Sequence, residues 1–424
     1  NFRKINLIVL FFLTFLVIFK SIFNPLHNFD EIPYSYLTSN VECTSERYIS
    51  HIKYMELNNQ INERNKKIMG SYGENFRKTY ISDPKYFCSS LPMYSSKKFY
   101  IILARAINKI IDDPIISLRV IATATSSIWF FLIGFKILEY KKSDQNFFKI
   151  VPLLILYKMA KSIGIISSPD ALATLFFSIS IIFINKINIK SSNSINNLNE
   201  RSKLDIGFIF ISSFFGFLAF YTRANLIIPI FFSFILLKII GYNVKRIIIY
   251  YGLIFIITLL LFNFIFNDIL LYQQDSYSFI SPLMSTFGGL YGLSGPLNVY
   301  FYNITFNDIF AEIDFYRPFL KNILLASLSA VFPALSFYLK FTLGFTFLNF
   351  EYHSTKINFS KMFFDKNFNI SLIFVMFSFI VQIILFPKFN LRLLSPFISM
   401  FLLFIIGQNS SKELTKIRNK LYTT

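Results

Sequence analysis

The chain consists largely of long apolar segments, and this pattern decides which folds are open to it. A helix needs about 20 apolar residues to cross the hydrocarbon core of a bilayer. Two of these segments, 150–167 and 170–185, are short. The residues Ser167-Ser168-Pro169 separate them, which predicts a tight hairpin or a broken helix. We predict ten spans: 5–23, 115–138, 150–167, 170–185, 204–221, 225–241, 247–267, 322–346, 369–386 and 391–407.

Composition supports an all-α polytopic membrane protein. Of the 424 residues, 54% are hydrophobic and only 15% are charged, whereas about 25% are charged in a typical soluble domain. The net charge of +19 would suggest nucleic-acid binding in a soluble protein. In a chain this apolar, the basic residues instead report how the spans are oriented, and we expect no nucleic acid partner.

The basic residues set the predicted topology. With both termini in the cytoplasm, the cytoplasmic connections carry several lysines and arginines each and few acidic residues, as the positive-inside rule favours. Two large loops then lie on the outer face: 24–98, with short juxtamembrane helices, and the acidic loop 268–321. The apolar segment 99–111 is too short to span and is expected at the interface or against the next helix. We treat 1–424 as a single transmembrane domain.

Both cysteines, Cys43 and Cys88, lie in the first outer loop. The expected location is a bacterial inner (plasma) membrane, with the endoplasmic reticulum membrane as the alternative. In either case the outer face is periplasmic or lumenal, and a disulfide is permitted there. A bridge between the two cysteines and a pair of free thiols are both open at this point.

Carboxylates stand at the outer ends of two spans. Asp30 and Glu31 follow the first span, close to His27. A carboxylate pair in this position can hold a metal ion or act as a general base on a sugar hydroxyl. Asp170 heads the fourth span, where an ionised side chain needs a partner or water. The alternative for Asp30 and Glu31 is a hydrated loop start, helped by an Asp that caps the next helix. The alternative for Asp170 is an N-cap, in which Asp170 or Ser168 accepts hydrogen bonds from exposed helix amides.

Cations also stand on the outer face. Arginine can hold a phosphate through two parallel hydrogen bonds, and lysine supplies a point charge. The alternative is that these long side chains only reach toward the headgroups. We assign the following residues to phosphate binding: Arg223, Lys388, Arg392, Lys97 and Lys98. The two lysines form a basic cluster with Arg105 close to the outer headgroups, and Arg119 is expected to pair with an acid.

Taken in order, these motifs resemble those of the GT-C superfamily, the integral-membrane glycosyltransferases that include protein O-mannosyltransferases and the bacterial aminoarabinose lipid A transferase. Leu393 stands where the last family motif has tyrosine. The pattern is also similar to the dolichyl-phosphate-glucose glucosyltransferases. The elements that carry the resemblance are Asp30-Glu31, Leu91 to Tyr94, Leu118-Arg119, Ser168-Pro169-Asp170, Thr222-Arg223 and Lys388 to Pro396.

The resemblance implies transfer of a sugar, with inversion, from a polyprenyl-phosphate donor to a hydroxyl of a lipid, glycan or protein acceptor at the outer face. It implies that Asp30 is the general base, with Glu31 beside it, and that Asp170 orients the acceptor, the donor or a metal. Arg223 is implied to bind the donor phosphate, together with Lys388 and Arg392. The resemblance fixes no cofactor, and a divalent metal stays open.

Two other functions stay open. A transporter or flippase of a lipid-linked or anionic solute would carry polar residues inside its spans, and Lys158 and Lys161 lie within the third span. An O-antigen polymerase or ligase would also use a large outer loop with arginines. The sequence shows no clear internal repeat, which transporters commonly have.

Overall fold

The structure is a computed structural model in which the described residues are mostly helical. They comprise 2–27, 30–57, 83–95, 97–139, 149–186, 198–223, 226–239 and 244–266, with short pieces at 352–353, 356–357, 395–396, 398–400 and 402–403. Within them, strand is limited to the antiparallel pair β1 (Tyr352–His353) and β2 (Lys356–Ile357). The predicted helical class is therefore confirmed for this part of the chain.

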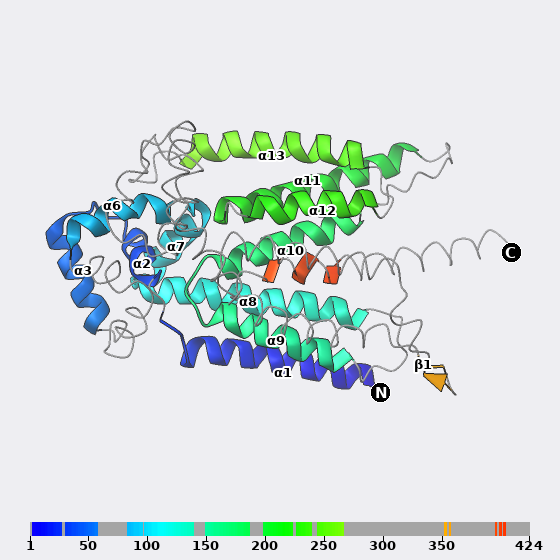
Figure 1. Ribbon diagram of the computed structural model, residues 1–424, viewed down its shortest axis with the longest axis horizontal. Helices are drawn as coiled ribbons and strands as arrows, with labels where there is room; N and C mark the ends of the chain where they lie inside the picture. The colour runs from blue at the N-terminus through cyan, green and yellow to red at the C-terminus, as the bar shows by residue number, and fades with distance from the viewer. Residues whose placement is uncertain are drawn as a thin grey trace, which may run out of the picture.

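Antiparallel helices form a bundle along the long axis of the molecule (Figure 1). Helices α1 and α8 are long and apolar enough to cross a membrane. The predicted spans 322–346 and 369–386 lie outside the described residues, as does most of 391–407. The bundle consists of α1 (Phe2–Phe23), α8 (Pro114–Glu139), α9 (Ile150–Gly164), α10 (Asp170–Lys186), α11 (Leu198–Thr222), α12 (Ile227–Ile239) and α13 (Val244–Phe266).

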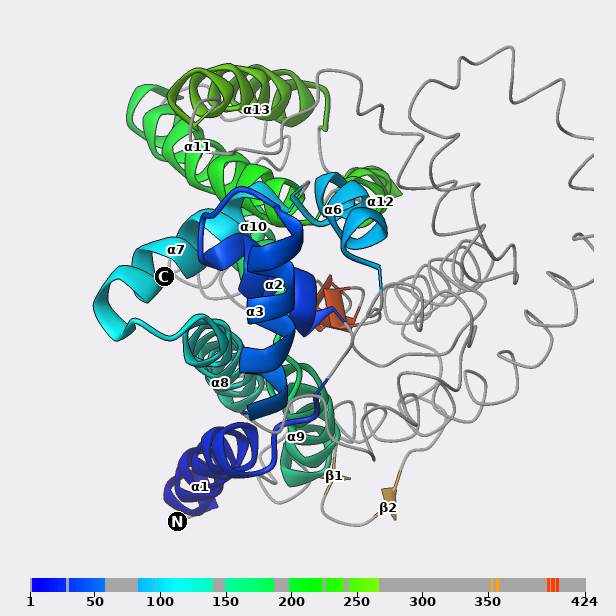
Figure 2. The same ribbon diagram turned by 90° about the vertical axis from the view of Figure 1, so that its left-hand side faces the viewer.

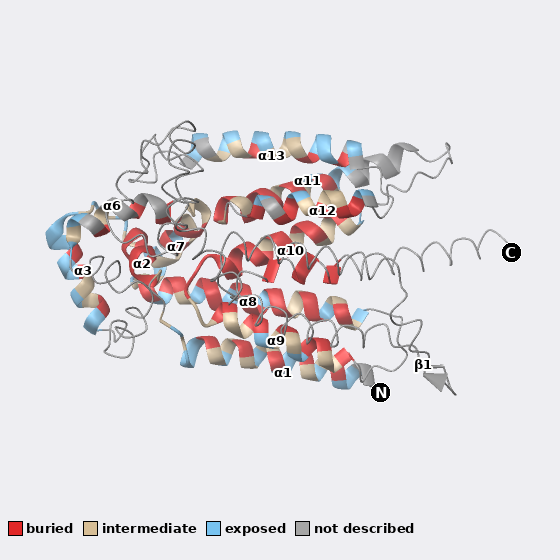
Figure 3. Ribbon diagram, in the orientation of Figure 1, coloured by how far each residue is buried: buried red, intermediate tan, exposed pale blue. Residues whose placement is uncertain are grey.

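The bundle interior is apolar and closely packed, and its outer faces are apolar as well. Trp129 and Phe177 are fully buried in the main hydrophobic cluster, which α1 and α8 to α13 all supply. A Cβ on Gly164 would collide with the hydroxyls of Ser126 and Ser21, so glycine allows α9 to approach both α8 and α1. Figure 3 shows exposed residues along the outer face of α13, and the large apolar residue Phe264 of this helix is 86% exposed.

One end of the bundle is covered by short helices, which we call the cap. Figure 2 looks onto the cap, with these helices in front of the bundle ends. The cap arises from the predicted outer loop 24–98 and from the segment 99–111, which forms a helix against α8. Its helices are α2 (Glu31–Thr38), α3 (Ser45–Leu57), α6 (Pro84–Ser95) and α7 (Lys98–Ile111).

Helix α2 is the centre of the cap, and all eight of its residues are buried. Aromatic side chains surround it: Tyr36 packs edge-on against both Phe87 of α6 and His51 of α3. The imidazole Nε2 of His51 lies 3.2 Å from the carbonyl oxygen of Ile32. Burial lowers the pKa of His51 to about 4, so this side chain is neutral at physiological pH and packs as part of the core.

A disulfide between Cys43 and Cys88 joins the α2–α3 connection to α6. The two cysteines are 45 residues apart in sequence, and no free cysteine is present. Closing a loop of this length removes many conformations from the unfolded chain. The bridge therefore fixes α6, and the segment that follows it, against the buried helix α2.

Replacing Cys43 by serine is expected to lower the free energy of unfolding of the oxidised protein by about 4 kcal/mol, through the lost loop constraint. Chemical unfolding in mixed detergent micelles, with and without a reducing agent, measures this loss. The reducing agent is expected to destabilise the wild-type protein by a similar amount and to leave Cys43→Ser unchanged. An equal response of both proteins to reduction would show that the bridge does not stabilise the cap.

Candidate functional site

Polar side chains from separate parts of the sequence come together where the cap meets the bundle. Ion pairs and electrostatic interactions link them into one group, which we call the junction cluster. The elements that supply it meet at the cap end of the bundle, the left-hand end in Figure 1. The members are His27, Asp30, Glu31, Lys97, Tyr100, Arg119, Asp170 and Arg223.

Asp170 and Arg223 form a largely buried ion pair in the cluster. Asp170 is the first residue of α10 and is 3% exposed, while Arg223 directly follows α11 and is 19% exposed. Arg223 Nη1 pairs with Asp170 Oδ1, and the hydroxyl of Ser168 donates to Asp170 Oδ2 at 3.0 Å. The expected need of Asp170 for a partner is confirmed. Arg223 binds a buried carboxylate, so it does more than reach toward headgroups.

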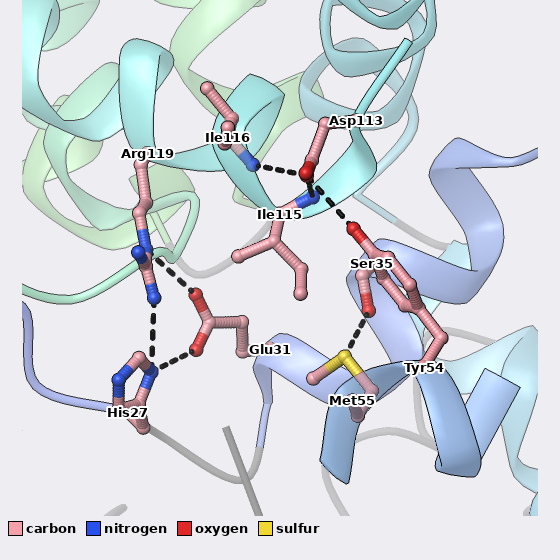
Figure 4. A network of polar contacts seen from close by, with 9 residues as sticks. All are labelled: His27, Glu31, Ser35, Tyr54, Met55, Asp113, Ile115, Ile116 and Arg119. Atoms are coloured by element: carbon pink, nitrogen blue, oxygen red, sulfur yellow. Dashed lines mark hydrogen bonds and ion pairs between the residues drawn. The ribbon is translucent and has the colours of Figure 1, made fainter. Parts of the chain in front are cut away.

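Glu31, at the start of α2, is held by two side chains from other elements (Figure 4). Its Oε2 lies 3.1 Å from His27 Nδ1, and its Oε1 lies 3.7 Å from Arg119 Nε. Arg119 Nη2 is also 3.2 Å from His27 Nδ1. The predicted pairing of Arg119 with an acid is confirmed. Glu31 is only 2% exposed, and its carboxylate is held in this buried position by both partners.

Local sequence explains where Arg119 lies. Asp113 caps α8: its Oδ1 accepts hydrogen bonds of 2.9 Å from the backbone N–H groups of Ile115 and Ile116, and Pro114 occupies the first helical position. Tyr54 of α3 donates a 2.9 Å hydrogen bond to the same oxygen (Figure 4). The cap is thereby tied to the start of α8, from which Arg119 reaches Glu31.

Asp30 precedes α2, but its side chain makes no capping hydrogen bond to that helix. The side chain of Asp30 therefore does not act as the helix cap that was the alternative role for it. Asp30 interacts electrostatically with Lys97, the residue before α7. Burial and, as a smaller effect, the positive charge of Arg223 lower the pKa of Lys97 to about 8, although the negative charge of Asp30 acts to raise it. Lys97 therefore interacts electrostatically with both Asp30 and Arg223.

Tyr100 is a member of the cluster that sequence analysis missed. It is fully buried on α7, and its ring packs edge-on against Tyr34, with 5.2 Å between the ring centroids. Burial raises the pKa of Tyr100 well above its usual value, and the charges of Glu31 and Asp30 raise it further. The one available signal was its position three residues after Lys97.

The remaining predicted residues lie elsewhere or outside the described part. Lys98 is turned toward α11, with Nζ 5.6 Å from the centroid of the Tyr221 ring. The expected place of Arg105 near the headgroups is wrong: it is 7% exposed, and its Nε donates a 2.9 Å hydrogen bond to the carbonyl of Leu37. Lys388 and Arg392 lie outside the described residues.

The chemistry of the cluster comes from paired charges in a partly buried site. Asp30, Glu31 and Asp170 are opposed by Arg119, Arg223 and Lys97. Among the described residues, no three His, Cys, Asp or Glu side chains are grouped so that they could hold a metal ion. Comparisons of the chain with protein-family models, with curated proteins and with solved structures found no match.

Replacing Arg223 by alanine is expected to destabilise the protein by about 3–5 kcal/mol, because the charge of Asp170 would stay buried without this partner. The matched control is Lys136→Ala, which breaks an exposed ion pair with Glu139 at the other end of α8 and should cost less than about 1 kcal/mol. Chemical unfolding in mixed micelles compares the two variants. An equal loss of unfolding free energy in the two variants would show that the buried pair of Asp170 and Arg223 stabilises the protein no more than an exposed pair does.

Proposed function

We propose that the protein is a membrane glycosyltransferase that moves a sugar from a polyprenyl-phosphate donor to a hydroxyl of an acceptor at its capped end. The observation that carries the proposal is the junction cluster, in which Asp30, Lys97 and Arg223 lie together at the end of an apolar bundle. It supplies a carboxylate for the proton of an alcohol and cations for a phosphate, next to helices with apolar outer faces. The resemblance to the GT-C superfamily favours the same reaction.

In the proposed reaction, the oxygen of the acceptor hydroxyl attacks the anomeric carbon, and the bond from that carbon to the phosphate oxygen breaks. The leaving phosphate keeps the electron pair of the broken bond, and Asp30 takes the proton of the attacking hydroxyl. Lys97 and Arg223 stabilise the negative charge that develops on the leaving phosphate. A guanidinium has five N–H donors, so Arg223 can hold Asp170 and a phosphate oxygen together.

The remaining cluster residues have positioning roles in this proposal. Glu31 is bound to Arg119 and His27, so it fixes the start of α2 and thereby the position of Asp30. Asp170 orients Arg223. Lys388 and Arg392 are proposed to bind the donor phosphate from a later part of the chain, and Lys98 from the start of α7. A divalent metal stays open as an additional component.

We infer a membrane location from the two long apolar helices and from the exposed apolar faces of α1 and α13. The proposed topology has ten spans, both termini in the cytoplasm of a bacterial cell and the cap on the periplasmic side. The disulfide of the cap supports this orientation, because disulfides persist in oxidising compartments. Lys136, Lys186 and Lys238 lie at the opposite helix ends, as the positive-inside rule favours.

Replacing Asp30 by asparagine is expected to lower kcat by roughly 10²–10⁴-fold, because the amide cannot accept the proton. The assay measures transfer of a labelled sugar from polyprenyl phosphate by the protein in reconstituted membranes. The assay is run at saturating donor, so that any change in the charge of Lys97 affects donor affinity and not kcat. The control is Asp83→Asn, an exposed carboxylate before α6 that lies outside the cluster. A wild-type rate in Asp30→Asn would exclude Asp30 as the base.

Donor affinity is expected to fall as the pH rises from 7 to 9. Because the pKa of Lys97 is about 8, its charged fraction falls roughly tenfold over this range, while a phosphodiester keeps its charge. The KM for the donor, measured against pH, should therefore rise in the wild-type protein. In Lys97→Arg it should stay nearly constant, because a guanidinium remains protonated. The same rise in both proteins would assign the pH dependence to another group.

A further inference from the structure

A groove lies between α12 and α13, and its lining is mostly apolar. Its volume is about 740 Å³. Ile230 and Tyr251 line it with buried side chains, whereas Phe231 and Ile256, which also line it, are more than half exposed. The groove is therefore open to the surroundings of the bundle. Its volume falls within the range of about 300–1,000 Å³ that is usual for ligand sites.

The groove forms because α13 packs mainly against α11 and only lightly against α12. A Cβ on Gly216 of α11 would overlap the hydroxyl of Tyr251, so glycine allows α13 to lie close to α11. The Tyr251 Oη thereby comes within 3.5 Å of Ser180 Oγ on α10. Gly252 lines the groove, and a Cβ there would meet no neighbouring atom within 4 Å. This position of α13 therefore faces open space.

The length of the groove matches one leaflet of a bilayer. Its lining extends from Ile227 to Lys238 on α12 and from Lys245 to Ile256 on α13. Each of these stretches rises about 17 Å along its helix, close to the roughly 15 Å that one leaflet contributes to the hydrocarbon core. The groove can therefore hold one extended acyl chain of a lipid.

The charged residues of the groove are two lysines at one of its ends. Lys238 lies in the last turn of α12 and Lys245 in the first turn of α13, and both side chains are exposed. No acidic side chain is among the described residues that line the groove. The end of α12 and the start of α13 lie away from the cap (Figure 1). Basic residues at a membrane surface attract anionic headgroups, so this end complements the headgroup of such a lipid.

We propose that the groove between α12 and α13 binds an anionic phospholipid, with one acyl chain along the groove and the phosphate at Lys238 and Lys245. The site goes beyond the proposed transfer reaction, because it lies at the opposite end of the bundle from the junction cluster. It depends on the proposed membrane location and not on sugar transfer. In the proposed topology the lipid comes from the cytoplasmic leaflet, and its chain joins two helices that otherwise touch little.

The test is native mass spectrometry of the protein in neutral detergent micelles, titrated with phosphatidylglycerol or with phosphatidylcholine. The wild-type protein should bind the anionic lipid roughly tenfold more tightly than the zwitterionic one. Loss of both charges in Lys238→Gln/Lys245→Gln should weaken phosphatidylglycerol binding roughly 10–30-fold. The control is Lys4→Gln/Lys186→Gln, which removes two exposed lysines at the same end of the bundle but outside the groove and should bind as the wild type does.

A second pair of variants tests whether the acyl chain occupies the groove. Gly252→Phe fills the groove while both lysines remain, and its Cβ has room. It should weaken phosphatidylglycerol binding at least about tenfold, because the chain loses its apolar contacts. The matched control is Gly207→Phe on α11, where a Cβ also meets no neighbouring atom within 4 Å and which lies outside the groove. This control should bind the lipid as the wild type does.

Equal binding of the two lipids would overturn the proposal, because the headgroup charge would not be recognised. Wild-type affinity in Gly252→Phe would also overturn it, since the chain would then lie elsewhere. Equal losses in the two lysine double variants would assign binding to the overall charge of this end. A monomer or dimer that takes up no lipid would contradict the proposal too, because a segment of the chain or a second copy would fill the groove. None of these results bears on sugar transfer, so the proposed function is tested separately.

Discussion

The site depends on the burial of Asp170 at the head of α10. An ionised carboxylate that is 3% exposed is stable only with a nearby cation, and Arg223 supplies it from the end of α11. This requirement joins the ends of two helices that pack closely along their length. It also brings the positive charge of Arg223 to act on Lys97, whose pKa is lowered first by burial and then by this charge. The structure thus holds two cations near each other, an arrangement that an anionic ligand would stabilise.

The cap brings the acidic side of the cluster to these cations. Burial of the whole of α2 fixes Asp30 and Glu31 at its start, and the disulfide and His51 hold that helix from the other side. Asp113 links the cap to α8 by accepting hydrogen bonds from both Tyr54 and the helix backbone. The elements that hold the cluster are therefore packed by apolar contacts, while the cluster itself is polar.

Sequence reasoning identified the helices well, because hydrophobic length decides them: the predicted spans 115–138 and 170–185 match α8 and α10 within one residue at each end. It also singled out Asp170 and Arg223, since an ionised carboxylate at the head of an apolar helix needs a partner, and an arginine on the outer face departs from the positive-inside rule. Their pairing was not predictable, because it depends on how α10 and α11 pack. Arg105 was misplaced for a related reason: its hydrogen bond to Leu37 exists only once α7 covers α2.

The central claim is that the junction cluster binds a lipid-linked phosphate sugar at the capped end of the bundle. The most direct measurement is an electron cryomicroscopy map of the protein in lipid nanodiscs with a non-hydrolysable polyprenyl-phosphate sugar analogue. The account predicts density for the phosphate within hydrogen-bonding distance of Lys97 and Arg223, with the sugar toward Asp30. Phosphate density away from the cap, with the junction cluster closed by its own ion pairs, would contradict it.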